Sequence, residues 1–143
     1  MAADLFPVKE RFGEIVAGER WGIVPFALYK YQGELELRIA EVWFLSWLFV
    51  HKWNNDDTFP SLNALSRYTG ISRQYIQEIA HGLMDKGYIE IKERRYENGA
   101  ITSNLYDIQP LITMLETKIK ADKFSEYRKT EGNTTRVAGG IQM

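Results

Sequence analysis

The sequence contains no cysteine, which excludes disulfide bonds and thiolate metal ligands. Because such a chain suits a reducing compartment, we predict a cytoplasmic protein. A long apolar run is missing too. The most apolar stretch, Val42–Val50, has nine residues and contains Ser46, whereas a membrane span needs about 20. The first twelve residues carry four charges and do not look like a signal peptide. The sequence therefore predicts a protein without membrane contact.

The usual marks of catalysis are scarce as well. There is no glycine-rich phosphate loop and no cysteine nucleophile. The two histidines, His51 and His81, fall in different predicted helices and lack the spacing of metal ligands. Asp56 and Asp57 form a polar loop pair, and exposed loop acids are usually just solvated. We expect no enzymatic activity, no metal, no cofactor and no small-molecule substrate.

Charge of one sign is not in excess either, since the formal net charge is -1. The local balance is -3 over residues 1–60, zero over 61–109 and +2 over 110–143. DNA-binding domains usually carry a basic footprint. The neutral middle region therefore keeps a protein-interaction module open as an alternative function.

What the chain does have is a composition typical of one soluble domain, with 45% hydrophobic and 26% charged residues over 143 positions. No internal repeat is visible. We predict four parts: an N-terminal arm (1–20), a central domain (21–112), a C-terminal helix with a possible dimerisation role (113–129), and a disordered tail (130–143).

The first half of the central domain is unusually apolar. Residues Trp21–Tyr31 are predicted to run extended, because Pro25 lies in their middle. Leu35–Asn54 is predicted to be the first long helix. Its polar positions Arg38, Glu41 and Lys52 share one narrow exposed strip at 100° per residue, and most of the remaining circumference is apolar. Such a helix needs cover on more than one side, from its own chain or from a second copy.

The second half has the local signals of two helices and a hairpin. A helix over Ser61–Thr69 starts at the N-cap Ser61 and ends at Gly70. A third helix starts at the N-cap Ser72, runs to about Lys86 and is closed by Gly87. Two strands follow (88–96 and 101–108), joined at Asn98-Gly99, a strong hairpin signal. A last helix follows Pro110 and reaches about Ala121 or beyond. The predicted fold is mainly α with a small β-hairpin wing, a winged helix-turn-helix.

The third helix has two distinct faces. Its apolar residues fall within one face and are predicted to enter the core: Ile76, Ile79, Ala80 and Leu83. The opposite face is polar and carries Gln74, Gln77, Glu78, His81 and Asp85, with Tyr75 at its flank. Gln can bind adenine through two hydrogen bonds and Glu can accept from cytosine in the major groove. A polar face alone does not indicate DNA binding, because any exposed helix would have a solvated face. The position of this face, after a Gly-centred turn and before a hairpin, is what favours DNA binding.

Cationic and hydroxyl side chains around this helix suit phosphate. Arg73 and the backbone amides near Ser72 lie at the helix start, where anions bind. Arg94 and Arg95 lie in the wing, although Glu90, Glu93 and Glu97 dilute its basic character. The predicted contacts to double-stranded DNA are Ser61, Ser72, Arg73, Gln74, Tyr75, Gln77, His81, Lys92, Arg94, Arg95, Thr102, Ser103 and Asn104.

Several of these runs together resemble a known family. They are Phe59-Pro60-Ser61, Leu65-Ser66, Gly70-Ile71-Ser72-Arg73, Lys86-Gly87-Tyr88-Ile89, Arg94-Arg95, Asn98-Gly99 and Thr102-Ser103-Asn104-Leu105-Tyr106-Asp107. Over roughly residues 22–112 the chain is similar to the N-terminal winged-helix domain of phage and plasmid replication initiators, the DnaD-like and replisome-organizer proteins. The resemblance implies binding to DNA at an origin or operator, often as a dimer, with the third helix in the major groove and the wing on the backbone.

Two further functions stay open at this point. A transcriptional repressor of the same fold would make the same DNA contacts, and a winged helix can also serve as a protein-interaction module. We also predict a symmetric homodimer, from the all-round apolar first helix and the helix after Pro110. Its two reading helices would meet major grooves about 34 Å apart on a pseudo-palindromic site.

Overall fold

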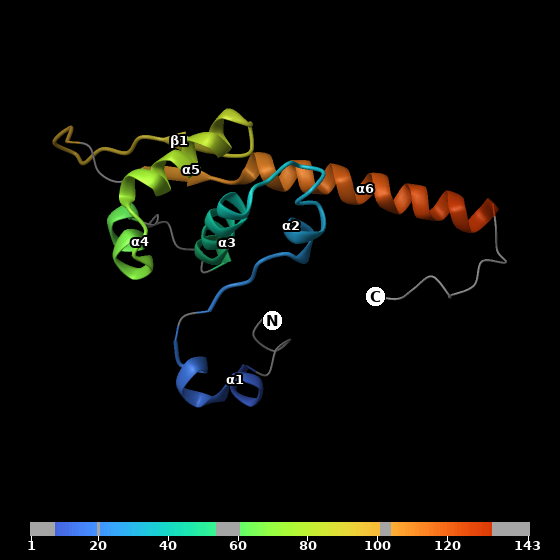
Figure 1. Ribbon diagram of the computed structural model, residues 1–143, viewed down its shortest axis with the longest axis horizontal. Helices are drawn as coiled ribbons and strands as arrows, with labels where there is room; N and C mark the ends of the chain where they lie inside the picture. Colours follow the sequence, from blue (N-terminus) through green and yellow to red (C-terminus); the bar gives the residue numbers. More distant parts are fainter. Residues whose placement is uncertain (1–7, 20, 54–60, 101–103, 133–143) are drawn as a thin grey trace.

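The computed structural model describes residues 8–19, 21–53, 61–100 and 104–132, with the side chains of Trp53 and residues 125–132 left out. This part of the chain is mainly helical, with a two-stranded antiparallel hairpin, which confirms the predicted fold class. The elements in chain order are α1 (Val8–Ala17), α2 (Phe26–Lys30), α3 (Ile39–Trp53), α4 (Leu62–Thr69), α5 (Arg73–Asp85), β1 (Glu90–Lys92), β2 (Leu105–Asp107) and α6 (Gln109–Gly132) (Figure 1).

Helix α2 corrects the predicted extended run over Trp21–Tyr31. Residues 21–25 are non-helical, the chain turns helical directly after Pro25, and Tyr31 caps the end of the helix. Pro25 takes the N-cap position with φ -69°. A proline interrupts a helix only where its missing N–H and its ring meet a preceding turn, and no turn precedes this position. Proline therefore marks the start of α2 and does not prevent it.

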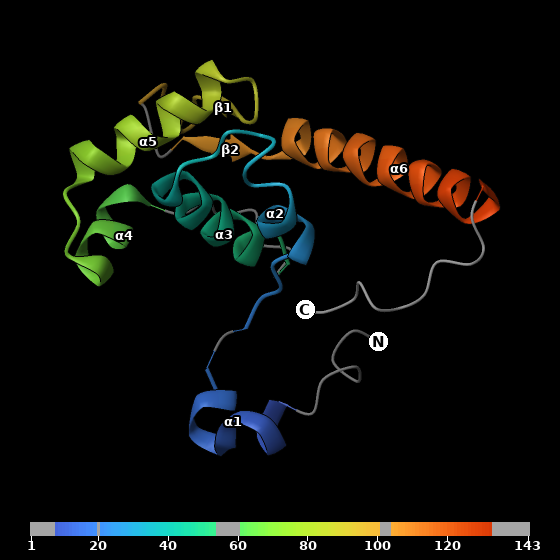
Figure 2. The same cartoon turned by 45° about the vertical axis from the view of Figure 1, so that its right-hand side comes forward.

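Helix α3 starts four residues later than predicted. The Tyr31 and Gln32 carbonyls accept hydrogen bonds from the backbone of Leu35 and Leu37, so this stretch forms a turn. The helix that follows supplies the centre of the core with five buried side chains, Val42, Phe44, Leu45, Leu48 and Phe49. Figures 1 and 2 show α3 in the middle of the domain, among α2, α4, α5 and the hairpin. Its large apolar surface is thus covered to a great extent within one chain.

Glu41 is the clearest error of the helical-wheel prediction. It was placed on an exposed strip with Arg38 and Lys52, but it is 0% exposed. Its Oε1 accepts hydrogen bonds from the Arg38 backbone N–H at 2.8 Å and from Lys86 Nζ at 2.7 Å. The Arg38 guanidinium lies 3.6 Å from Oε2. Buried carboxylates occur where such partners compensate the charge. The pair with Lys86 joins the start of α3 to the end of α5.

The helix-turn-helix forms as its local signals predict. Ser61 caps α4 by accepting from the Ala64 N–H, and Ser72 caps α5 by accepting from the Tyr75 N–H. Gly70 ends α4 with φ +76°, a left-handed conformation that glycine adopts without strain. The Ser66 hydroxyl donates to the Ile71 carbonyl at 2.6 Å and closes the turn. The predicted core face of α5 is confirmed, since Ile76, Ile79, Ala80 and Leu83 are all buried.

The paired strands of the wing are shorter than predicted. They have three residues each, with Ile91 opposite Tyr106 in the register. Near the tip, the Tyr96 N–H donates to the Ala100 carbonyl and the Asn98 side chain accepts from the Ala100 N–H, so the Asn98-Gly99 turn is present. Tyr106 packs edge-on against Phe44, with 5.7 Å between ring centroids. This contact fixes the base of the wing on α3.

Helix α6 is longer than the predicted C-terminal helix and begins before Pro110, which lies in its first turn. The Asp107 carboxylate accepts from the Gln109 N–H at this end. Leu111 and Leu115 are buried, and the helix continues through Gly132, so the predicted boundaries after 112 and 129 fall inside it. Figure 1 shows that α6 projects far beyond the other helices.

Helix α1 lies within residues 1–20, the segment that the sequence predicts to be an N-terminal arm. None of its residues is buried, and its backbone is kinked at Gly13. Figures 1 and 2 both show α1 apart from the remaining helices, joined to them by the segment that leads into α2.

Candidate nucleic-acid interface

Helix α5 presents its predicted reading face to the outside of the domain. Gln74, Glu78 and His81 are exposed at positions i, i+4 and i+7, and Gln77 is half-buried beside them. The opposite face packs on α3 and α4. Because the apolar face is held in the core, the helix cannot rotate, and the polar side chains keep one fixed outward direction.

Two of the predicted contact residues, Ser61 and Ser72, are also helix caps. Ser61 and Ser72 are exposed, and each hydroxyl oxygen accepts a hydrogen bond from the first turn of its helix. The hydroxyl hydrogen remains able to donate, since a serine hydroxyl is both donor and acceptor. Both serines therefore combine helix capping with a donor at a helix N-terminus, a combination that suits a phosphate oxygen.

The start of α5 lies beside the wing. Burial raises the pKa of Tyr106, while a hydrogen bond with Asn104 and the nearby positive charge of Arg73 act in the opposite direction. These interactions relate Arg73 at the start of α5 to Asn104 and Tyr106 of the descending wing, which lie more than 30 positions later in the sequence. Two predicted site residues, Arg73 and Asn104, thus both act on Tyr106, and part of the hydrogen-bonding capacity of Asn104 is used by this contact.

The wing cations are partly engaged with carboxylates. Lys92 Nζ lies 3.6 Å from Glu90 and 3.9 Å from Asp107. Arg95 forms a 2.8 Å ion pair with Glu93 and donates to the Gly99 carbonyl at 2.8 Å. All these pairs are at least partly exposed, and exposed pairs contribute only about 0–1 kcal/mol. A phosphate can replace such a carboxylate at little cost. Arg94 is half-buried and also has a partner.

Two predicted contacts, Thr102 and Ser103, lie outside the described residues. The remaining predicted residues are exposed or half-buried on α4, α5 and the wing, and Tyr75 is 45% exposed.

Three side chains at this end of the domain were not predicted. Arg67 and Tyr68 lie at the end of α4, where the guanidinium stands 5.4 Å from the ring centroid, and Tyr68 is 74% exposed. Tyr96 is exposed near the wing tip. The signal for Arg67 was present, because it falls opposite the buried Leu62 and Leu65 on a short amphipathic helix, with Tyr68 at the flank of the buried face.

Within the described part of the chain, no group of three or more potential ligands (His, Cys, Asp or Glu) could hold a metal ion. Among the same residues, no helix combines the length and apolar character needed to cross a membrane.

The DnaD N-terminal domain family matches residues 24–126. The match covers most of the chain, from the residue before Pro25 through the greater part of α6, and the chain belongs to this family. The resemblance noted over residues 22–112 is thereby confirmed and extended by about one half of α6. Membership of the family places the chain in DNA replication, at its initiation stage. A comparison with curated proteins finds no match.

Proposed function

We propose that this protein binds double-stranded DNA in a sequence-dependent manner during replication initiation of a phage or plasmid, and that it acts without catalysis. Helix α5 enters the major groove and the wing lies along the adjacent phosphates. The protein acts as a homodimer, so that two α5 helices meet successive major grooves about 34 Å apart. Membership of the family supports a role in replication initiation, and the geometry around α5 supports the proposed manner of DNA binding.

The arrangement of α5 and the wing carries this proposal. The polar face of α5 points outward while its apolar face is locked in the core. The charge of Arg73 at its start acts on Tyr106 of the wing, which Asn104 hydrogen-bonds. A polar helix edge flanked by a hairpin is the shape that fits a groove and its phosphate border. Gln74 and Gln77 provide base-edge contacts, and the arginines provide phosphate contacts.

The near-neutral charge of this region predicts moderate affinity with few phosphate contacts. We expect binding to duplex DNA to weaken with salt, with a slope of about -0.9 for each neutralised phosphate. Fluorescence anisotropy with a labelled random-sequence duplex, measured over a series of salt concentrations, tests this. A specific site is obtained by capturing genomic fragments on the immobilised protein and sequencing them.

Variants separate the two kinds of contact. Arg94→Ala with Arg95→Ala should weaken binding to every duplex and reduce the salt slope by about two. Lys118→Ala with Lys120→Ala on α6 is the matched control, because it removes the same charge away from α5 and the wing. Gln77→Ala should leave the random duplex unaffected but reduce preference for the captured site by about 1–3 kcal/mol. Equal losses in the wing and control variants would contradict the proposed orientation.

A protein-interaction module is the second candidate, and the neutral charge balance over residues 61–109 favours it. It predicts no measurable duplex binding even at low salt. A repressor would bind duplex in the same manner, and the position of the captured fragments, at a promoter or at an origin, distinguishes it from an initiator.

A further inference from the structure

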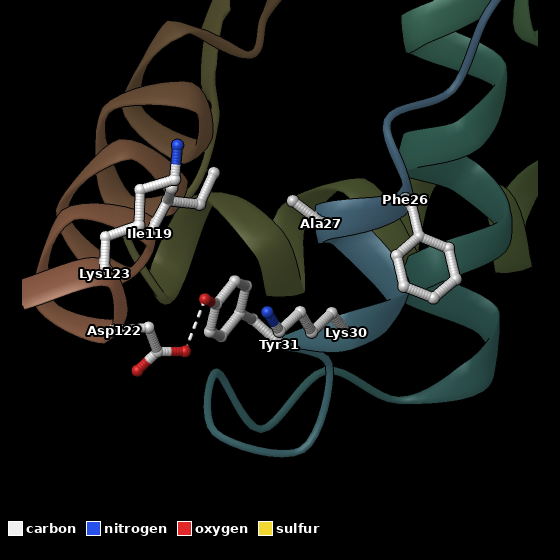
Figure 3. Close-up of a pocket in the computed structure, with 7 residues that line it drawn as sticks. All are labelled: Phe26, Ala27, Lys30, Tyr31, Ile119, Asp122 and Lys123. Atoms are coloured by element: carbon white, nitrogen blue, oxygen red, sulfur yellow. Dashed lines mark hydrogen bonds between the residues drawn. The ribbon is translucent and has the colours of Figure 1, made fainter. Parts of the chain in front are cut away.

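A pocket of about 230 Å³ opens between α2 and α6, and Figure 3 shows its lining. Ala27 of α2 and Ile119 of α6 provide apolar walls, and the Tyr31 ring lies between the two helices. Phe26 also lines the pocket and is 75% exposed. Clefts that hold cofactors and drug-sized ligands measure about 300–1,000 Å³, so this smaller pocket suits one large apolar side chain.

Polar contacts hold the two walls of the pocket together. The Tyr31 hydroxyl donates to the Asp122 carboxylate at 2.5 Å, and Tyr31 is only 1% exposed. The Lys118 ammonium lies 3.2 Å from the carboxylate of Glu34, in the turn after α2. Both contacts join α6 to α2 or to the turn that follows it, so the pocket exists before any ligand binds. A partner that meets a preformed site loses less free energy to ordering.

Positive charge borders the apolar walls. Lys30 of α2 and Lys123 of α6 line the pocket from its two helices, and both are exposed. The Lys30 ammonium stands 5.5 Å from the centroid of the Tyr31 ring. Asp122 is the acidic residue of the lining, and its Oδ2 already accepts from Tyr31. This charge distribution favours an acidic ligand and disfavours a basic one.

We propose that the pocket binds a short acidic segment of another protein, which inserts one aromatic or aliphatic side chain between Ala27 and Ile119. Carboxylates on either side of this anchor meet Lys30 and Lys123. A peptide is the class of ligand that carries several acidic groups and one large apolar side chain on a single short chain. The pocket shares no residue with the proposed DNA interface, so this inference goes beyond the proposed function and does not rest on it.

Fluorescence anisotropy with three labelled, amidated peptides tests the proposal on the whole chain. The probe has a central phenylalanine with two aspartates on each side. One control peptide has alanine in place of phenylalanine, and the other has lysines in place of the aspartates. We expect a dissociation constant below about 100 µM for the probe and at least tenfold weaker binding of both controls. Equal binding of the alanine peptide would show attraction by charge alone and would overturn the proposal, as would a probe that does not bind.

Variants of the pocket separate the anchor from the charges. Ala27→Leu fills the pocket and should weaken binding of the probe at least tenfold. Lys30→Gln with Lys123→Gln should weaken it at least threefold in low salt, and these exposed positions keep the test decisive if Ala27→Leu does not fold. Lys9→Gln with Arg11→Gln is the matched control, because it removes the same charge from α1, which lies apart from α6 in Figures 1 and 2. Equal losses in the two charge variants would refute the pocket as the binding site.

Nuclear magnetic resonance locates the contact directly. When isotope-labelled protein is titrated with the probe, the backbone amide signals of Ala27, Tyr31 and Ile119 should shift most, while that of Gln77 on α5 should stay in place. The largest shifts on α5 or on the wing would contradict the proposal. Displacement of the probe by random-sequence duplex would show that nucleic acid is the ligand of this surface, which would overturn the assignment of a peptide.

Discussion

Replacing Lys86 by methionine tests the buried ion pair between α3 and α5. Methionine keeps most of the aliphatic stem but removes the ammonium group that donates to Glu41 Oε1 at 2.7 Å and to the Glu36 carbonyl at 2.8 Å. The Glu41 side chain is fully buried, so water cannot replace the lost donor. Removing one partner of a buried pair costs about 3–5 kcal/mol.

The expected loss is smaller than that because Arg38 remains. Its backbone N–H still donates to Glu41 at 2.8 Å, and its guanidinium lies 3.6 Å from the other carboxylate oxygen. Lys86 is also 35% exposed, so its charge is partly screened. We therefore expect Lys86→Met to lower the free energy of unfolding by about 1.5–3 kcal/mol.

Urea denaturation at pH 7 measures this loss through a lower midpoint at constant slope. Lys92→Met is the matched control, because its ion pairs with Glu90 and Asp107 are longer and more exposed; it should cost less than about 0.5 kcal/mol. In the double variant Lys86→Met with Glu41→Gln, part of the loss should be recovered, since the buried charge is gone. Equal midpoints for Lys86→Met and Lys92→Met would refute the reasoning.

Three further predictions concern acid stability, capping and the reading face. Burial raises the pKa of Glu41, but hydrogen bonds from Arg38 and Lys86 and their charges outweigh it and lower the pKa below its ordinary value. The stability from this group is therefore present above the unfolded-state pKa of about 4.3 and is lost as the pH falls toward the lower folded-state pKa. Glu41→Gln should weaken this dependence of stability on acid pH in urea titrations at pH 3–5. Ser72→Ala removes the acceptor for the Tyr75 N–H and should cost about 0.5–2 kcal/mol, whereas Ser72→Asp should restore the cap; an unchanged midpoint for both would contradict the capping role. Glu78→Gln removes a carboxylate from the exposed face of α5 and should tighten binding to random duplex about threefold to tenfold in low salt. Glu116→Gln on α6 is the control and should leave binding unchanged. If Glu78→Gln does not change the anisotropy titration either, this face does not approach phosphates.

The helix-turn-helix was predictable because its signals are local. Ser61, Gly70 and Ser72 each act on backbone groups within three or four residues. The core face of α5 follows from the helical period alone. The same reasoning applies to Asn98-Gly99, whose turn is formed by neighbouring residues.

The features that escaped prediction depend on distant partners or on short elements. Glu41 is buried because Lys86, 45 positions later, reaches it, and no periodicity contains that information. Helix α2 has five residues, too few for a helical pattern to stand out against Pro25. The pocket depends on Tyr31 and Asp122, which are 91 positions apart. Of the candidate DNA contacts, the helical ones follow from periodicity, whereas the proximity of Arg73 to the wing is a property of the assembled core.

The buried ion pair also affects the surface proposed to bind DNA. Helix α5 is held at its end by Lys86 and Glu41, and the start of α5 lies beside Tyr106, which packs on Phe44 of α3. Both ends of α5 are thus held in position relative to α3, and this fixes the direction of the polar face of α5. A duplex that meets a preorganised surface incurs little additional ordering cost. We therefore expect Lys86→Met to weaken duplex binding more than the loss of one partly exposed charge explains, and the effect should persist at high salt, where a direct phosphate contact would be screened.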